Sequence, residues 1–337
     1  MVPILLLLAA ACGDAGSPEA GASEEASASG ALTVYSGREE EFVAPLFEKF
    51  EADTGITVEV RYGDSAELAA TIAEEGDASP ADVFFSQDAG SLGAVAEAGL
   101  LTTLDDDILD RVDERFRSDD GSWVGTSGRG RVAVYNTDQV DPGELPASIL
   151  GFTDPAWRGR LGLPPTNSSF QAHVAGMIVS EGGEATRRFL EGLMDNDLVF
   201  YEDNGATTRA VAAGEIEVGL VNHYYKYEVE AEDGALPLAN HYFEPGDPGA
   251  FVNAAGVGIL ASGEHPDEAA RFVDYVTGDA GQTFVAEDTW EYPVTPGLEP
   301  SVDIIPLDEF RGPDVDLSSL GAELPAALAL LADVGMV

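Results

Sequence analysis

Basic residues and cysteine are scarce in this sequence. Its 337 residues include 16 Lys and Arg against 62 Asp and Glu, which gives a formal net charge of −46. So few bases exclude nucleic acid and anionic membrane surfaces as partners, because both bind clustered Lys and Arg. The single cysteine, Cys12, excludes a disulfide within the chain. The apolar fraction of 45% still supports packed cores, so we expect a folded protein whose acidic surface suits a saline habitat or reflects a high-GC genome.

Motifs of the common enzyme classes are also missing. The four histidines show no HExxH or HxH spacing, and no second cysteine is present for a zinc or iron–sulfur site. No GxSxG elbow, phosphate loop or dinucleotide fingerprint follows a predicted strand. A secreted hydrolase or transferase with Glu39 or Asp88 as a general base is an alternative, but it lacks a nucleophile and an acid partner. The sequence therefore predicts that the protein is not an enzyme.

Long hydrophobic runs are absent apart from one at the start. Residues 4–11 are too short to span a bilayer, and they end at Cys12. This arrangement resembles a bacterial lipoprotein signal, although no basic residue precedes the run and Ala9 stands where Leu is commoner. We predict a signal over residues 1–12, lipidation of Cys12, a flexible tether over residues 13–30, and a lipid-anchored protein on the outer face of the cytoplasmic membrane or in the periplasm. The alternative is a cleaved secretory signal with an incidental cysteine.

The periodicity from residue 31 onward predicts alternating strands and helices. Strands are expected at 31–35, 56–60 and 81–85, and helices at 39–52, 65–76 and 89–100. This βαβαβα order requires a parallel sheet with helices on its faces, and such sheets bind ligands beyond the carboxyl ends of their strands. The segments at those ends are YSGRE (35–39), RYGDS (61–65) and SQDAG (86–90).

The second half of the chain predicts a further α/β unit. Strands are expected at 131–136, 216–221 and about 257–260, and helices at 187–194, 206–215 and 268–278. Two α/β lobes are the economical interpretation of this length. The last segment, 320–335, is predicted to be a terminal docking helix.

Tyr224 and Tyr225 stand together at the carboxyl end of a predicted strand. Adjacent side chains leaving a strand diverge, so these two converge only if the chain turns there. Phenolate oxygen is a hard anionic donor, and Fe³⁺ displaces the phenol proton despite an ordinary pKa of about 10. From the residues alone, packed or rim aromatics are the commoner explanation of such a pair, so the pair by itself decides nothing.

The few cations provide a second indication of a ligand. Arg38 follows the first strand, Arg129 and Arg131 flank a glycine-rich turn, and Lys226 follows the tyrosines. Cations at ligand-facing loops of so acidic a protein favour an anion held in a cleft, whereas salt bridges to carboxylates are the alternative for each arginine. Further donors are expected from Ser168, Ser169, Asn204 and Asn222.

Six segments in order resemble one family, the ferric-ion-binding substrate-binding proteins of ABC importers, over residues 31 to about 295. They are LTVYSGREEEFVAPLFEKFEADTGITVEV, EEGDASPADVFFSQDAGSLGAVAEAGLL, GTSGRGRVAVYNTDQV, PPTNSSFQ, AVAAGEIEVGLVNHYYKYE and DPGAFVNAAGVGIL. The resemblance implies a transferrin-like, two-lobe periplasmic-binding fold with crossover strands, a closing cleft, a monomer, and delivery of Fe³⁺ to the membrane permease of an ABC transporter. The first lobe is expected to comprise residues 31–129 plus about 255–305, and the second 130–254 plus about 306–337.

The resemblance also implies roles for individual residues. Tyr224 and Tyr225 match the paired tyrosines that bind iron in the family, and Glu39 occupies the position where many members place a histidine ligand. Gln87 stands where some members have a glutamate ligand, and Phe170 lies in the loop where others place a third tyrosine. Fewer protein oxygens leave room for a synergistic anion, carbonate or phosphate, with partners expected at Arg38, Asn167, Ser168, Ser169, Asn204 and Asn222.

The predicted function is therefore capture of ferric iron, with a synergistic anion, between two lobes. One alternative is a binding protein of the same fold for thiamine, a polyamine or a phosphonate, in which the tyrosines contact an organic ligand. Another is a structural surface lipoprotein, which leaves unexplained why three loops at strand ends carry the distinctive residues.

Overall fold

The computed structural model describes residues 31–337, so Cys12 and the predicted signal and tether lie outside the described residues. Over residues 31–100, the predicted alternation of strands and helices is confirmed. The helix Glu40–Thr54 buries Val43, Leu46, Phe47 and Phe50 on one face, and Gly55 ends it in the left-handed conformation, with φ of 73°. The apolar spacing and the glycine stop therefore decide this element locally.

The elements alternate along the chain as follows. The strands are β1 (Ala31–Ser36), β2 (Thr57–Tyr62), β3 (Val83–Ser86), β4 (Trp123–Asn136), β5 (Leu161–Leu163), β6 (Val199–Phe200), β7 (Val218–Asn222), β8 (Leu238–His241) and β9 (Val252–Ile259). The α-helices are α1 (Glu40–Thr54), α2 (Ser65–Glu75), α3 (Ala89–Glu97), α4 (Asp106–Leu109), α5 (Ser168–Glu181), α6 (Gly183–Asp195), α7 (Asn204–Ala213), α8 (Tyr225–Asp233), α9 (Pro266–Thr277), α10 (Asp279–Asp288) and α11 (Leu320–Asp333). Short 3₁₀ turns lie between them, including η2 (Glu114–Phe116) and η7 (Leu317–Ser319). No helix within residues 31–337 combines the length and the apolar character needed to cross a membrane.

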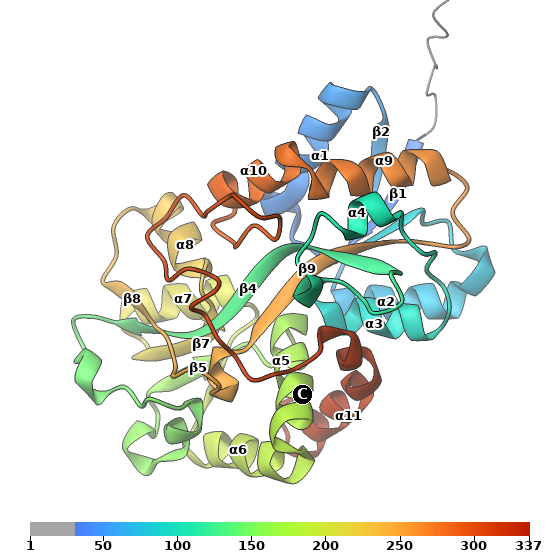
Figure 1. The fold of residues 1–337 in the computed structure, drawn as a ribbon. Helices are drawn as coiled ribbons and strands as arrows, with labels where there is room; N and C mark the ends of the chain where they lie inside the picture. The colour runs from blue at the N-terminus through green and yellow to red at the C-terminus, as the bar shows by residue number, and fades with distance from the viewer. Residues whose placement is uncertain (1–30) are drawn as a thin grey trace, which may run out of the picture.

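One sheet runs through both halves of the described chain, in the order β2-β1-β3-β9-β4-β7-β5-β6, with β8 paired to β4. β1 pairs in parallel with β2 and β3, as the βαβ pattern requires. β4 pairs with β9 as far as Gly130 and with β7 and β8 from Arg131 onward. Figure 1 shows β4 and β9 side by side through the middle of the molecule, with α9 and α10 above them and α3 below.

We name the two halves from this change of partners. The first lobe holds β1–β3, β9, the start of β4 and helices α1–α4, α9 and α10; the second holds the end of β4, β5–β8 and helices α5–α8. The residue boundaries predicted from the sequence stay a prediction. β4 is continuous across the junction and therefore belongs to both lobes. The candidate site lies beside this strand.

The glycine-rich segment 125–131 differs from its prediction. It forms no turn, and it lies inside the 14-residue strand β4 with one bulge between Gly125 and Ser127. A Cβ atom on Gly130 would stand 2.6 Å from the Phe310 ring, and one on Gly125 would stand 2.8 Å from the Phe116 carbonyl oxygen. The glycines therefore let aromatic residues pack directly on the strand, a tertiary demand that local turn preference does not reveal.

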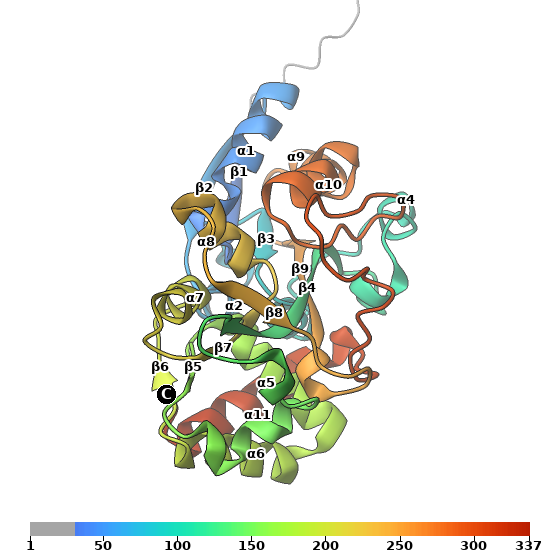
Figure 2. The same cartoon turned by 90° about the vertical axis from the view of Figure 1, so that its left-hand side faces the viewer.

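The terminal helix α11 packs against both lobes. It contacts α3 of the first lobe and α5 of the second, and Figure 2 shows it beneath α5 at the foot of the molecule. It crosses α3 at two glycines, because a Cβ on Gly321 would stand 2.4 Å from the Gly93 carbonyl carbon. This close approach joins the lobes behind the cleft.

Candidate functional site

The tyrosine pair lies where β7 gives way directly to α8. β7 ends at Asn222, and Tyr224 has helical backbone angles of −79° and −22° just before α8 begins at Tyr225. This is the turn that convergence of the two side chains requires. The ring centroids lie 4.4 Å apart with an interplanar angle of 30°, and the residues are only 1% and 2% exposed. The strand-to-helix turn therefore places two buried phenols side by side.

Glu39 of the first lobe meets this pair from the opposite side of the cleft. It lies between β1 and α1, and the Tyr225 hydroxyl donates to Glu39 Oε1 at 3.4 Å. Glu39 is exposed by its accessible surface, yet surrounding protein atoms desolvate the carboxylate and raise its pKa, and the charge of Asp203 raises it further. The structure therefore brings together the three predicted metal residues.

Arg129 on β4 contacts the second phenol. Its guanidinium donates to the Tyr224 hydroxyl and to the Gln87 backbone carbonyl. Burial raises the pKa of Tyr224, although the charge of Arg129 acts to lower it. Burial, followed by the charge of Glu39, raises the pKa of Tyr225 well above its ordinary value. Both hydroxyls accordingly keep their protons at neutral pH in the metal-free protein.

Arg38, predicted as an anion partner, forms a salt bridge. Its Nη2 atom lies 2.8 Å from Glu291 Oε2, and its Nη1 atom donates to Ser127 Oγ at 3.4 Å. Glu291 also lies 2.9 Å from Arg129 Nε. Arg38 therefore forms the salt bridge to a carboxylate that was the alternative to anion binding. Its guanidinium has fewer donors free for an anion as a result.

Glu291 is the residue that sequence reasoning missed. Nothing in the local pattern marks it, because the two arginines it meets are more than 150 positions away along the chain. Burial alone would raise its pKa, but Arg38 and Arg129 together lower it below the ordinary value. The carboxylate therefore stays ionised in a site that it shares with two buried cations.

The predicted anion donors lie at the starts of two helices and at the end of β7. Asn167 caps α5 by accepting from the Ser169 amide at 3.1 Å, and Asn204 Nδ2 donates to Ser169 Oγ at 3.5 Å. Ser168 Oγ donates to Gln87 Oε1 at 3.0 Å, so that the side-chain amide oxygen of Gln87 is already engaged.

Two of these donors retain unpaired buried atoms. Asn222 Oδ1 accepts from Arg131 Nη1 at 3.1 Å, but Asn222 Nδ2 has no hydrogen-bond partner. Asn204 Oδ1 is likewise buried without a partner. Buried polar atoms are costly when unpaired, so this part of the cleft is better satisfied with a polar ligand than without one.

Two further groups have structural roles. His223 is buried between the Gly130 amide, 3.2 Å from Nδ1, and the Trp290 carbonyl, 3.1 Å from Nε2. Burial lowers its pKa to about 4, and both ring nitrogens are committed, so it offers no metal ligand. Asp88, weighed as a general base, caps α3 by accepting from the Ser91 amide and hydroxyl at 2.8 and 2.9 Å, and burial raises its pKa to about 6.

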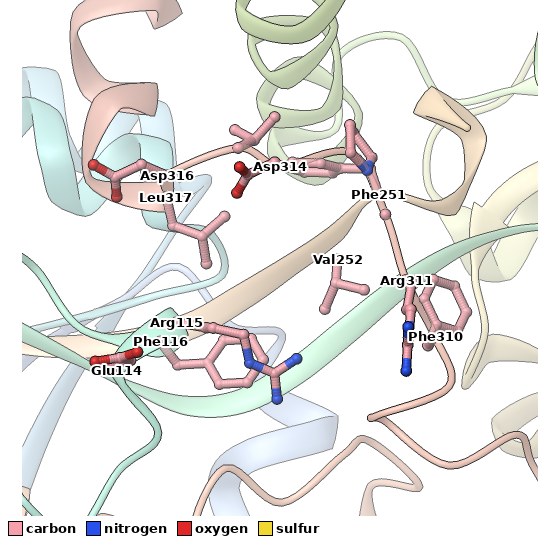
Figure 3. A pocket seen from close by; sticks show the side chains of 13 residues that line it. Glu114, Arg115, Phe116, Phe251, Val252, Phe310, Arg311, Asp314, Asp316 and Leu317 are labelled. Carbon is pink, nitrogen blue, oxygen red and sulfur yellow. The ribbon is translucent and has the colours of Figure 1, made fainter. Parts of the chain in front are cut away.

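Several hollows lie on the surface of the described chain. Figure 3 shows one of about 400 Å³, lined by η2, the start of β9 and residues 310–317, which shares no residue with the tyrosine cluster. A smaller hollow of about 230 Å³ lies at the cleft, where Glu39, Phe42, Glu228 and Trp290 are among its lining. Tyr224 and Tyr225 line neither hollow, so the chemistry of the buried cluster and not the volume of a cavity identifies the candidate site.

Known proteins are similar to this chain in sequence and in fold. The model of the bacterial extracellular solute-binding protein family matches residues 35–283. An Fe(3+)-binding periplasmic protein of Serratia marcescens is 32% identical, and the match covers 94% of this chain and 93% of the relative. The structure of iron-bound HitA from Pseudomonas aeruginosa has a TM-score of 0.86 and 36% identity, with coverage of 90% and 99%.

A third similar protein is Trichodesmium IdiA (FutA), whose structure is a complex with iron and citrate ligands. It has a TM-score of 0.77 and 28% identity, and the match covers 91% of this chain and 99% of that one. These structural matches confirm the predicted two-lobe α/β fold. The chain belongs to the family of bacterial extracellular solute-binding proteins.

Proposed function

We propose that the protein binds ferric iron outside the cytoplasm and delivers it to the permease of an ABC transporter. The observation that carries this proposal is the convergence of Tyr224 and Tyr225 from the second lobe with Glu39 from the first. Two phenolates and one carboxylate balance the charge of Fe³⁺ and are hard oxygen donors. The names of the similar proteins, which include ferric-binding proteins, support the same cargo.

Binding of an organic ligand by the tyrosines has less support. The Tyr224 ring lies 5.5 Å from the Phe42 ring and 4.4 Å from the Tyr225 ring, and Arg129 lies 5.3 Å from its centroid. Protein groups therefore surround the ring that a stacked ligand would need. The two carboxylates weighed as general bases, Glu39 and Asp88, contact a phenol and cap a helix, so we propose a binding protein and no catalysis.

The proposed cargo includes a synergistic anion, carbonate or phosphate. The unpaired Asn222 Nδ2 donor supports an anion, and the positive end of the α5 helix dipole at Ser168 favours negative charge. The unpaired Asn204 Oδ1 atom is an acceptor and would instead take a proton donor on the ligand. Asn167 orders the α5 terminus by capping it, and Arg38 contributes through its positive charge more than through free donors.

We further propose that the protein acts as a monomer anchored to the membrane by a lipid on Cys12. Residues 13–30 contain no large apolar residue and would serve as a flexible tether. Such an anchor keeps the binding protein close to its permease. Mass spectrometry of the protein from membranes tests the lipid, because a free Cys12 thiol would contradict it.

Ferric loading tests the proposed function. Addition of ferric citrate and bicarbonate to the purified protein should produce a visible phenolate-to-iron charge-transfer band at one iron per chain. The Tyr224→Phe/Tyr225→Phe double variant should bind no coloured iron while keeping its fold by circular dichroism. A wild-type protein that stays colourless after loading would contradict the proposal.

A further inference from the structure

We propose that Glu291 is a positioning residue for the metal centre, because its carboxylate holds Arg129 where the guanidinium donates to the Tyr224 oxygen. The inference rests on the proposed ferric function and extends it to a residue that would not touch the metal. Glu291 is 0% exposed and lies between Arg38 and Arg129, which are 4% and 1% exposed. It comes from the crossover after α10, far along the chain from both arginines.

The backbone around Glu291 is fixed on both sides. The preceding residue, Trp290, has φ of 54°, a left-handed conformation that is uncommon for a large side chain, and its carbonyl contacts His223 Nε2 at 3.1 Å. The following residue, Tyr292, exchanges two backbone hydrogen bonds with Gly128 at 2.7 and 3.0 Å. Gly128 and Arg129 are neighbours on β4. The strand therefore positions the Arg129 guanidinium directly, and it positions the Glu291 carboxylate through the hydrogen bonds between Gly128 and Tyr292.

Each nitrogen of the Arg129 guanidinium faces one oxygen atom. Nη1 donates to the Gln87 carbonyl, Nη2 donates to the Tyr224 hydroxyl, and Nε lies 2.9 Å from Glu291 Oε1. The Nε contact is an ion pair whose geometry is not that of an aligned hydrogen bond. Among these three partners only Glu291 is charged, and a buried arginine without a carboxylate would carry an uncompensated charge. Glu291 therefore balances the charge of Arg129 and holds the guanidinium close to β4 by an ion pair.

Arg131, two residues along β4, provides the contrast. Its guanidinium donates to Asn222 Oδ1 at 3.1 Å and to the Leu220 carbonyl at 2.8 Å, which are neutral acceptors. No carboxylate of residues 31–337 lies within salt-bridge distance of it. Of the two arginines, the one that contacts the phenol is thus the one that the structure pairs with a carboxylate.

The Arg129 contact has a defined consequence for a metal-bound phenolate. An N–H donor on the coordinated oxygen withdraws electron density from it, which stabilises the phenolate orbitals and raises the energy of the phenolate-to-iron transition. It also restricts the direction in which the remaining lone pairs point. Groups outside the ligand set commonly change metal affinity about 10- to 100-fold by such effects.

The test compares the iron-loaded wild type with Glu291→Gln, which keeps the shape and removes the charge. We expect the variant to stay coloured, to absorb at longer wavelength than the wild type, and to bind ferric iron about tenfold more weakly. Glu217→Gln is the matched control, because Glu217 also forms a carboxylate–arginine pair, with Arg160 Nε at 2.8 Å. That control should keep the wild-type band and affinity.

The outcomes are distinguishable. A folded Glu291→Gln variant with the wild-type band and affinity overturns the role of Glu291 and leaves the ferric function intact. A colourless wild type overturns both. If Glu291→Gln does not fold, Arg129→Lys replaces it: loss of the planar donors should give the same shift to longer wavelength, and an unchanged band would overturn the proposal.

Discussion

Besides the strand β4 that they share, the two lobes meet in two different ways, through polar side chains at the tyrosines and through packed helices around α11. At the tyrosines, the contacts between lobes include Tyr225 to Glu39 at 3.4 Å and Ser168 to Gln87 at 3.0 Å. Behind the cleft, α11 packs on α3 and α5, and Gly321 meets Gly93 backbone to backbone.

This difference indicates which side opens. Polar contacts exchange for water or a ligand at a net cost of about 1 kcal/mol each, whereas separating packed helices exposes apolar surface and leaves voids. We therefore infer that α11 acts as a pivot and that the tyrosine side moves. A metal ion that binds both lobes would favour closure by replacing weak contacts with strong ones.

The largest effect on the tyrosine side should come from pH. Both phenols are protonated before binding, because burial raises their pKa values, so each ferric ion must displace two protons. Affinity should fall as the pH falls, by up to about 100-fold per pH unit, or about 10⁴-fold from about pH 8 to about pH 6. Competition with a chelator of known protonation constants measures the slope. A pH-independent affinity would show that phenolates are not the donors.

Loss of one phenolate should be the next largest effect. Tyr224→Phe or Tyr225→Phe removes one strong donor. We expect each variant to lose about 3 kcal/mol of binding free energy, which lowers ferric affinity about 100-fold. Tyr227→Phe is the control, because its hydroxyl donates to the Asp303 carbonyl at 3.1 Å and takes no part in the site. Equal losses in all three variants would argue for a general effect on folding.

On the α11 side, a single methyl group should break the packing. Gly321→Ala places a Cβ 2.4 Å from the Gly93 carbonyl carbon, so the helices must separate, and we expect a loss of about 1–3 kcal/mol in the free energy of unfolding. Gly183→Ala in α6 is the control, since a Cβ there meets nothing within 4 Å. Urea unfolding measures both, and an undamaged Gly321→Ala protein would remove the basis for a rigid pivot.

The smallest effect concerns an uncompensated acid at the mouth of the cleft. Burial, followed by the charge of Glu39, raises the pKa of Glu228 to about 8, and its Oε2 atom is buried without a partner. At neutral pH the folded protein therefore retains a proton that the unfolded chain releases, which destabilises the fold. Glu228→Gln should increase the free energy of unfolding by about 1 kcal/mol near pH 7.

The same variant should lose its advantage near about pH 4, where the carboxyl is protonated in both states. Thermal melts at the two pH values measure the difference. Glu41→Gln, which removes another carboxylate lining the same hollow, is the control. A Glu228→Gln protein no more stable than the wild type near neutral pH would show that the carboxyl is not destabilising.

Local sequence signals predicted much of the fold. The apolar face of α1 and its end at Gly55 could be predicted from the sequence, because apolar spacing and a left-handed glycine act within a few residues. The strand β4 was only partly predictable. Its glycines are typical of a turn, but they lie in a strand because Phe116 and Phe310, from distant segments, pack on them.

The candidate site divides in the same way. The sequence showed that the two tyrosines converge only if the chain turns between β7 and α8, and the family resemblance, not the local pattern, gave the pair a shared role. The partner of Arg38 could not be predicted, because Glu291 reaches it only through the crossover after α10. Charge scarcity correctly marked the arginines as unusual, but it could not distinguish an anion from a buried carboxylate as their partner.

The position of iron in crystals of the loaded protein shows directly whether the tyrosine pair binds the metal. An anomalous difference map collected at the iron absorption edge locates the metal independently of any assumed ligand. We expect one peak bonded to the oxygen atoms of both Tyr224 and Tyr225, within reach of Glu39 from the other lobe. Iron bound at the acidic surface, with no peak at the tyrosine pair, would contradict it.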